Sequence, residues 1–179
     1  MLSAGWMGAA KAQDKTPSKW RFHSINTVGW ITGKTEPVVQ LQTINGFRKD
    51  HLFLGLGVGT DHYKYSGVAA FADTRYYLGK RPSGFFAYGD GGIHFPTVTD
   101  KSLFSNIRYL KGFYSDLGAG YAVGCGKRSA IEFSAGWTYK RVTQRLSYWV
   151  HPTNAPDYEY VDKYMYNLTR IVFKAGFRF

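Results

Sequence analysis

The last fifteen residues, MYNLTRIVFKAGFRF (165–179), carry the pattern that decides the fold. From position 171 onward, apolar side chains occupy every second position, at Ile171, Phe173, Ala175, Phe177 and Phe179. Basic side chains occupy the other parity, at Arg170, Lys174 and Arg178. Successive side chains of a β-strand point to opposite faces of the sheet. The segment is therefore predicted to be a strand with one apolar and one cationic face.

The same period of two recurs upstream and divides the chain into alternating segments. Eight segments are predicted as strands: 20–31, 38–47, 52–63, 68–78, 85–95, 113–124, 130–140 and 165–179. A composition of 21 Gly, 14 Tyr and 13 Phe is typical of strands joined by tight turns. A length of 179 residues fits one domain. An all-β fold is therefore expected.

The lengths of the connections add a topology to this series of strands. Short connections are predicted at 48–50, 79–84 and 124–128, whereas 96–109 and 146–163 are long, although 32–36 and 62–67 are short as well. In an up-and-down meander every second connection lies at the same end. A transmembrane barrel has short turns at one end and longer loops at the other. The prediction is an eight-stranded antiparallel up-and-down transmembrane β-barrel.

Composition excludes several other classes of protein. No apolar run approaches the length of roughly 20 residues that a membrane-spanning helix needs. The single cysteine, Cys125, cannot form an internal disulfide or a zinc cluster. The formal charge of +11 would suit a nucleic-acid partner, but the basic residues are dispersed and no recognition motif occurs. No nucleic-acid partner is expected.

The amino terminus resembles the end of an export signal. Residues 1–10 (MLSAGWMGAA) are small and apolar, and residues 10–12 have the small-x-small pattern of a cleavage site. The predicted organisation is a signal-peptide remnant at 1–12, a periplasmic segment at 13–19 and the barrel at 20–179.

The polar parity carries charges of both signs, and an enclosed lumen would allow them to pair. Residues expected in this lumenal charge network are Arg21, Asp73, Arg75, Asp90, Asp116, Glu132, Lys140, Arg170, Lys174 and Arg178, with Asp61 on the same parity. A soluble, lipocalin-like barrel would show the same alternation with the apolar face inside. Aromatic residues that flank the apolar stretches, such as Trp20, Trp30 and Phe95, suit a membrane interface.

The carboxyl end favours the membrane alternative. Phe173, Phe177 and the terminal Phe179 stand on one parity, and this ending resembles the C-terminal insertion signal of bacterial outer-membrane barrels. Together with the export signal and the eight strands, the region 20–179 is similar to the small eight-stranded outer-membrane barrel family. The resemblance implies a monomer in the outer membrane of a Gram-negative bacterium, with membrane lipids and the assembly machinery as partners.

Some barrels of this kind act on lipid A, which would require a nucleophile and a base at the outer rim. His23 and Ser24 are adjacent and would point to opposite faces of a strand, and His94 has only Ser102 and Ser105 in the following loop. The five histidines lack metal-ligand spacing, and no cofactor or metal site is expected. Bulky lumenal residues would obstruct a pore, namely Phe53, Phe71, Tyr77, Phe86, Tyr88 and Tyr114.

The loop predicted at 147–163 is the remaining candidate for function. It holds Tyr148, Trp149, His151, Tyr158 and Tyr160, together with Asp157, Glu159 and Asp162. Such residues bind sugars or proteins, or pack against one another. The sequence favours a non-enzymatic surface protein acting in adhesion, interaction or envelope integrity. A lipid A-modifying enzyme using His94 or His23 is the alternative.

Overall fold

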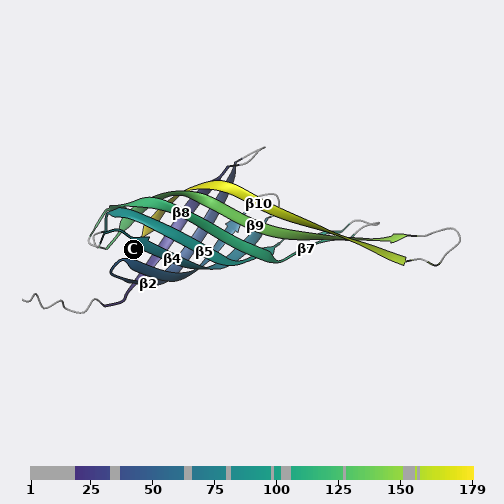
Figure 1. The fold of residues 1–179 in the computed structure, drawn as a ribbon, viewed down its shortest axis with the longest axis horizontal. Coiled ribbons are helices and arrows are strands. Elements are labelled where there is room, and N and C mark those ends of the chain that lie inside the picture. Colours follow the sequence, from purple (N-terminus) through teal and green to yellow (C-terminus); the bar gives the residue numbers. More distant parts are fainter. Residues whose placement is uncertain are drawn as a thin grey trace, which may run out of the picture.

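A computed structural model of the chain describes residues 19–32, 37–62, 66–79, 82–97, 99–101, 106–126, 128–150, 156 and 158–179. All regular structure in these ranges is β-strand (Figure 1). No helix among the described residues is long and apolar enough to cross a membrane. The strands are β1 Arg21–Ile31, β2 Val38–Lys49, β3 Leu52–Asp61, β4 Gly67–Tyr77, β5 Gly84–Pro96, β6 Thr99–Lys101, β7 Asn106–Leu110, β8 Gly112–Gly124, β9 Ala130–Val150 and β10 Tyr158–Arg178.

Eight of these strands close into a barrel, as predicted. The order β10-β1-β2-β3-β4-β5-β8-β9 returns to β10 through the β9–β10 pairing, and every neighbouring pair is antiparallel. The ring closes where Ile25–Ile31 of β1 pairs with Val172–Arg178 of β10. Beyond that register, Phe179 and Ser24 exchange two backbone hydrogen bonds of 3.0 and 2.9 Å. The sheet therefore has no free edge within the barrel.

The two ends of the barrel differ, and one of them extends far beyond the predicted boundaries. Strands β9 and β10 pair over 21 residues each and continue past the barrel as a long hairpin, to which β7 and then β6 add (Figure 1). The prediction of a loop at 146–163 is therefore wrong for 146–150 and 158–163, which are strand. The predicted loop 96–109 likewise contains β6 and most of β7.

The opposite end of the barrel carries the short turns, the start of β1 and the end of β10. Lys49 pairs with Leu52, which leaves a two-residue turn of Asp50 and His51 between β2 and β3. Asp50 has a φ of 51°, the left-handed conformation that such tight hairpins require and that Asp tolerates. His51 Nδ1 lies 2.7 Å from the carbonyl oxygen of Tyr77 and ties this turn to β4.

Side chains alternate between a lumen that holds charged and aromatic groups and an outer wall that is apolar. Apolar and aromatic side chains buried in the lumen include Ile25, Ile44, Phe53, Phe71, Tyr77, Phe86, Tyr88 and Tyr114. The outer parity exposes Leu54, Leu56 and Val58 on β3 and Phe173 and Phe177 on β10, with Leu56 73% exposed. A soluble ligand-binding barrel would have the opposite parity, with its apolar face inside.

Candidate functional sites: the lumen and the projecting hairpin

The lumen gathers ionisable side chains that are all deeply buried. Five are acidic and five are basic among the described residues: Asp61, Asp73, Asp90, Asp116 and Glu132, against Arg48, Arg75, Lys140, Lys174 and Arg178. Charges of one sign could not be buried at this density without partners of the other sign. The lumen is thus formally neutral.

Glu132 on β9 lies at the centre of the first cluster. Its Oε2 is 2.7 Å from Arg75 Nη1, and its Oε1 is 2.8 Å from Arg178 Nη1. Its Oε1 also accepts a hydrogen bond of 2.9 Å from the Tyr77 hydroxyl. Arg75 binds Asp73 as well, with Nη2 3.1 Å from Oδ2. The cluster therefore ties β4 to β9 and β10 across the bore.

Three aspartates form a row on neighbouring strands, and Lys174 reaches it from β10. Asp90 is the cross-strand partner of Asp73 on one side and of Asp116 on the other. Lys174 Nζ lies 2.7 Å from Asp116 Oδ2 and 3.7 Å from Asp90 Oδ2. The Tyr88 hydroxyl donates a 2.9 Å hydrogen bond to Asp116. Lysine and arginine thus offset the repulsion that like charges would feel at adjacent positions.

Two further basic residues extend the network towards the two ends. Lys140 Nζ lies 2.6 Å from Asp61 Oδ1. Arg48 was not among the predicted residues, because the expected strand ended at position 47. It donates from Nη2 to the Gly79 carbonyl at 2.9 Å, and its guanidinium lies 4.0 Å from the centre of the Tyr77 ring. The lumenal parity of Gln40, Gln42 and Ile44 could have revealed it.

Two predicted members of the network lie elsewhere. Arg21 has the lumenal parity, but it is the first residue of β1 and is exposed at the rim, so its expected place in the lumen is wrong. Arg170 is half-buried near the other end of the barrel, where its Nη1 donates to the Thr32 carbonyl at 3.4 Å.

Glycine makes room for the lumenal rings. A Cβ atom at Gly57 would lie 2.6 Å from Cζ of Phe71, and one at Gly55 would lie 2.9 Å from Phe53. On β8 and β9 the paired residues Gly118 and Gly136 both face Tyr88. These glycines therefore allow large rings to pack inside a narrow barrel, as their period of two suggested.

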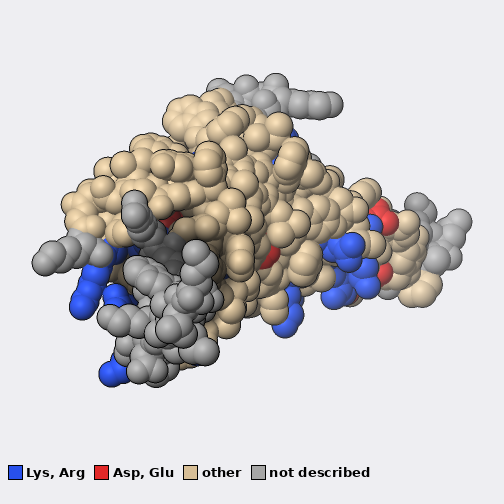
Figure 2. Space-filling view, turned by 60° about the vertical axis from the view of Figure 1, so that its left-hand side comes forward, with Lys and Arg blue, Asp and Glu red and all other residues tan. Residues whose placement is uncertain are grey.

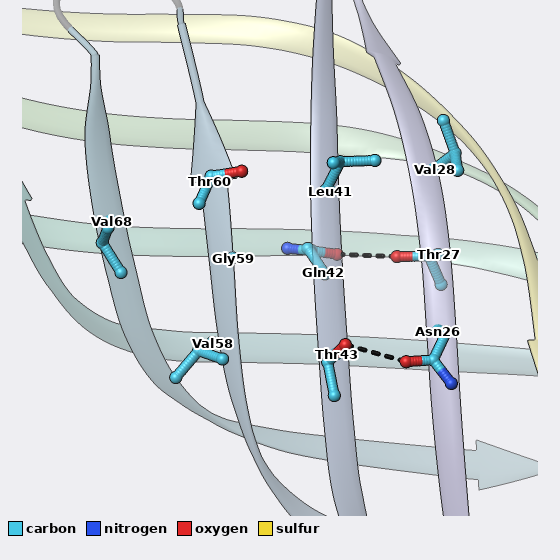
Figure 3. Close-up of a pocket in the computed structure, with 10 residues that line it drawn as sticks. All are labelled: Asn26, Thr27, Val28, Leu41, Gln42, Thr43, Val58, Gly59, Thr60 and Val68. Carbon is cyan, nitrogen blue, oxygen red and sulfur yellow. Dashed lines mark hydrogen bonds between the residues drawn. The ribbon is translucent and has the colours of Figure 1, made fainter.

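The outer wall has a shallow hollow of about 440 Å³ over β1–β4 (Figure 3). It forms where outward side chains are short, at Thr43, Val58, Thr60 and Val68. Inside it, the Thr43 hydroxyl donates a 2.8 Å hydrogen bond to Asn26 Oδ1. Two polar side chains of the apolar wall thus satisfy part of each other's hydrogen-bonding capacity.

The projecting hairpin has two chemically different faces. Paired residues share a face, so Tyr148 and Tyr160 stand together with ring centroids 5.3 Å apart. The tyrosine face consists of Tyr109, Tyr148, Tyr158, Tyr160 and Tyr164. Asp162, on the same face, raises the pKa of the Tyr164 phenol because a second negative charge beside it is unfavourable.

The opposite face of the hairpin continues the outer wall of the barrel. Arg108, Arg145 and Lys163 are direct cross-strand partners on β7, β9 and β10, and all three are exposed. Trp149 and Glu159 pair on this face nearer the tip. Of the five residues proposed for binding, Tyr148, Tyr158 and Tyr160 therefore share one face, and Trp149 lies on the other. His151 lies outside the described residues.

The histidines considered for the alternative enzymatic function are not assembled into a catalytic or metal site within the described residues. His23 is buried at the rim, and Ser24 follows it on the outer parity of the same strand. His94 is fully buried, while Ser102 and Ser105 lie outside the described residues. Across the described residues, no group of three or more His, Cys, Asp or Glu side chains is placed to hold a metal ion. The predicted signal segment 1–12 also lies outside the described ranges.

Comparison with known proteins identifies the fold. No protein-family model matches the sequence, and no curated protein is significantly similar to it. Among solved structures, the chain is similar to the crystal structure of the N-terminal β-barrel domain of Pseudomonas aeruginosa OprF, with a TM-score of 0.54 and 14% sequence identity. The match covers 88% of this chain and 96% of that one. At this identity the likeness establishes the barrel architecture alone.

Proposed function

We propose that the chain is a non-enzymatic outer-membrane barrel that holds the β9–β10 hairpin outside the cell as an interaction element. The observation that carries the proposal is the tyrosine face, presented on a hairpin that grows directly out of a closed barrel. Tyr158, Tyr160 and Tyr164 are each 44–51% exposed. Rigid aromatic rings with a polar edge are suited to binding sugars and proteins at low cost in conformational entropy.

The barrel itself supports a membrane location in this proposal. Its outer wall is apolar, and aromatic pairs stand near both ends: Phe22 with Phe47 and Phe85 with Tyr121 at the short-turn end, and Phe113 with Tyr139 at the other. Aromatic side chains at these two levels suit the two interfaces of a bilayer. The lumen, occupied by ion pairs and rings, argues for an anchor rather than a pore for bulky solutes.

Cysteine labelling tests the proposed topology. Cys125 is the only cysteine of the sequence and is exposed in the turn between β8 and β9. In Gram-negative cells exporting the full chain, a membrane-impermeant maleimide should label Cys125 only after the outer membrane is permeabilised. In a Cys125→Ser background, Trp149→Cys should be labelled on intact cells. Labelling of Cys125 on intact cells would contradict the proposed orientation.

Paired tyrosine variants test the binding role. The Tyr148→Ala/Tyr160→Ala variant removes the two rings that contact each other, and Tyr76→Ala/Tyr121→Ala removes two exposed rings from the barrel wall as a control. Purified proteins in detergent are compared on an array of immobilised glycans and on intact bacterial cells. Binding that falls in the first variant alone supports the proposal. Equal binding by all three proteins refutes a role for the tyrosine face.

A further inference from the structure

The net positive charge of the chain does not come from the lumenal residues. The five basic and five acidic lumenal side chains cancel, so the formal excess of 11 positive charges lies on the rest of the molecule. On the side of the molecule that Figure 2 shows, most of the barrel wall is uncharged, and Lys and Arg stand at the two ends, one group of them on the projecting part near a few acidic residues. Three basic residues of the hairpin, Arg108, Arg145 and Lys163, lie side by side on β7, β9 and β10, and we call them the cationic row.

The cationic row is unusual because its members oppose one another directly. Arg108 pairs with Arg145 on one side, and Arg145 pairs with Lys163 on the other. Like charges at directly opposed positions destabilise a sheet. Within the described residues, no carboxylate forms a salt bridge with any of the three. The arrangement therefore weakens the fold slightly and leaves three cations available to one anionic ligand.

The position of the cationic row relative to the apolar wall of the barrel indicates what kind of anionic ligand it contacts. On β9 the outward aromatic residues Trp137 and Tyr139 are followed on the same face by Arg141 and Arg145, and Trp149 lies farther out. With about 3.3 Å per residue and a strand tilt of about 40°, Arg141 lies about 5 Å and Arg145 about 15 Å beyond Tyr139. Long basic side chains at these levels reach the headgroup region of the surrounding leaflet.

We propose that the cationic row, with Arg141 beneath it, binds the phosphate groups of phosphorylated glycolipids in the outer leaflet. Arginine forms paired hydrogen bonds with phosphate oxygens, and two of the three members of the row are arginines. The inference rests on the proposed outer-membrane location. It adds a lipid ligand on the face of the hairpin opposite to the tyrosine face, so the two surfaces can act independently.

The test replaces the row and compares it with an equal loss of charge at the other end of the barrel. Arg108→Gln/Arg145→Gln/Lys163→Gln removes the row, and Lys19→Gln/Lys49→Gln/Arg128→Gln removes three exposed cations at the short-turn end. The full chains are purified in a zwitterionic detergent and titrated with a phosphorylated glycolipid, its dephosphorylated form and inorganic phosphate. A heat-dependent gel shift and urea unfolding verify the fold of each variant.

We expect the row variant to bind the phosphorylated glycolipid at least about tenfold more weakly, because each basic side chain contributes roughly fivefold at an anionic lipid surface. The control should bind like the unmodified chain, and the dephosphorylated lipid should bind all three weakly. The row variant should unfold at the same urea concentration or a higher one. Equal binding by the row variant and the unmodified chain overturns the proposal, as does an equal loss in the control.

Two other outcomes would also overturn the assignment to a glycolipid. Full competition by millimolar inorganic phosphate would show an anion site without lipid specificity and would overturn the assignment to glycolipid. Binding that survives dephosphorylation would do the same. These measurements use purified protein, so they stand apart from the labelling of Cys125 on cells, which tests the membrane location itself.

Discussion

Removing the charge of Glu132 is expected to destabilise the barrel strongly. Its carboxylate is 2% exposed, and it accepts contacts of 2.7 and 2.8 Å from Arg75 and Arg178 and a hydrogen bond of 2.9 Å from Tyr77. Glu132→Gln keeps the shape of the side chain, removes its charge and turns an NH₂ group towards donors. The variant tests whether the ion pairs, rather than the volume of the side chain, hold the lumen together.

The expected loss in the free energy of unfolding follows from the contacts that Arg75 and Arg178 keep in the Glu132→Gln variant. Arg75 still has Asp73 at 3.1 Å, but the described contacts that Arg178 keeps are both neutral: the Pro82 carbonyl at 3.0 Å and the Tyr77 ring, whose centre lies 4.7 Å from the guanidinium. Breaking a buried ion pair costs about 3–5 kcal/mol. Because one of the two arginines keeps a carboxylate, we expect a loss near the lower limit, about 3 kcal/mol in the free energy of unfolding.

Urea unfolding in detergent micelles, followed by the heat-dependent gel shift and tryptophan fluorescence, measures this loss. Glu159→Gln is the matched control, since Glu159 is exposed on the hairpin, and it should change stability by no more than about 0.5 kcal/mol. Combining Glu132→Gln with Arg178→Gln should cost less than the sum of the two single changes, because the pair interacts directly. A loss below about 1 kcal/mol for Glu132→Gln, or strict additivity, would refute the reasoning.

Three further predictions address other parts of the barrel. Lys174→Leu strands Asp116 and Asp90 in the lumen and should cost about 3 kcal/mol in urea unfolding; a negligible change would mean that water reaches both carboxylates. Gly118→Ala places a methyl group against the Ala135 backbone oxygen and 2.7 Å from the Tyr88 ring, and it should cost about 1–3 kcal/mol. Gly91→Ala, with nothing within 4 Å, should be near neutral, and similar losses in both variants would argue against crowding at Gly118. Phe179→Ala should lower the amount of folded protein in the membrane fraction more than Phe133→Ala, which removes an equally exposed ring near the start of β9. Equal yields would count against the proposed insertion signal.

The barrel strands could be predicted because each separates an apolar from a polar environment. That contrast produces the period of two in β4 and β10. From this period the sequence predicted that Lys174 and Arg178 face the lumen and that Phe173 and Phe177 face outward, as the structure has them. The partners of the lumenal charges could not be predicted. Arg75 and Glu132 are 57 residues apart, and Lys140 and Asp61 are 79 residues apart, so only the closed ring brings them together.

The hairpin beyond the barrel was missed for the complementary reason. Both of its faces are accessible, so Tyr158, Tyr160 and Tyr164 on one face alternate with Glu159 and Lys163 on the other without a clear apolar stripe. Pro152 and Pro156 nearby strengthened the expectation of an irregular loop. Arg21 was misplaced because parity alone does not show that a residue stands at the rim.

The joint between β1 and β10 makes the barrel a ring with one late step in its assembly. Seven residue pairs, about 150 positions apart in the chain, form this joint, whereas β9 and β10 align 21 pairs across a short connection. By the scaling of loop entropy with length, closing the ring costs about 2.5 kcal/mol more than closing that hairpin. We therefore expect the hairpin to form early and the ring to close last. Until β1 pairs with β10, the nascent sheet exposes two unpaired edges that can pair with other chains. The rate of this last pairing step therefore governs the fraction of chains that aggregate.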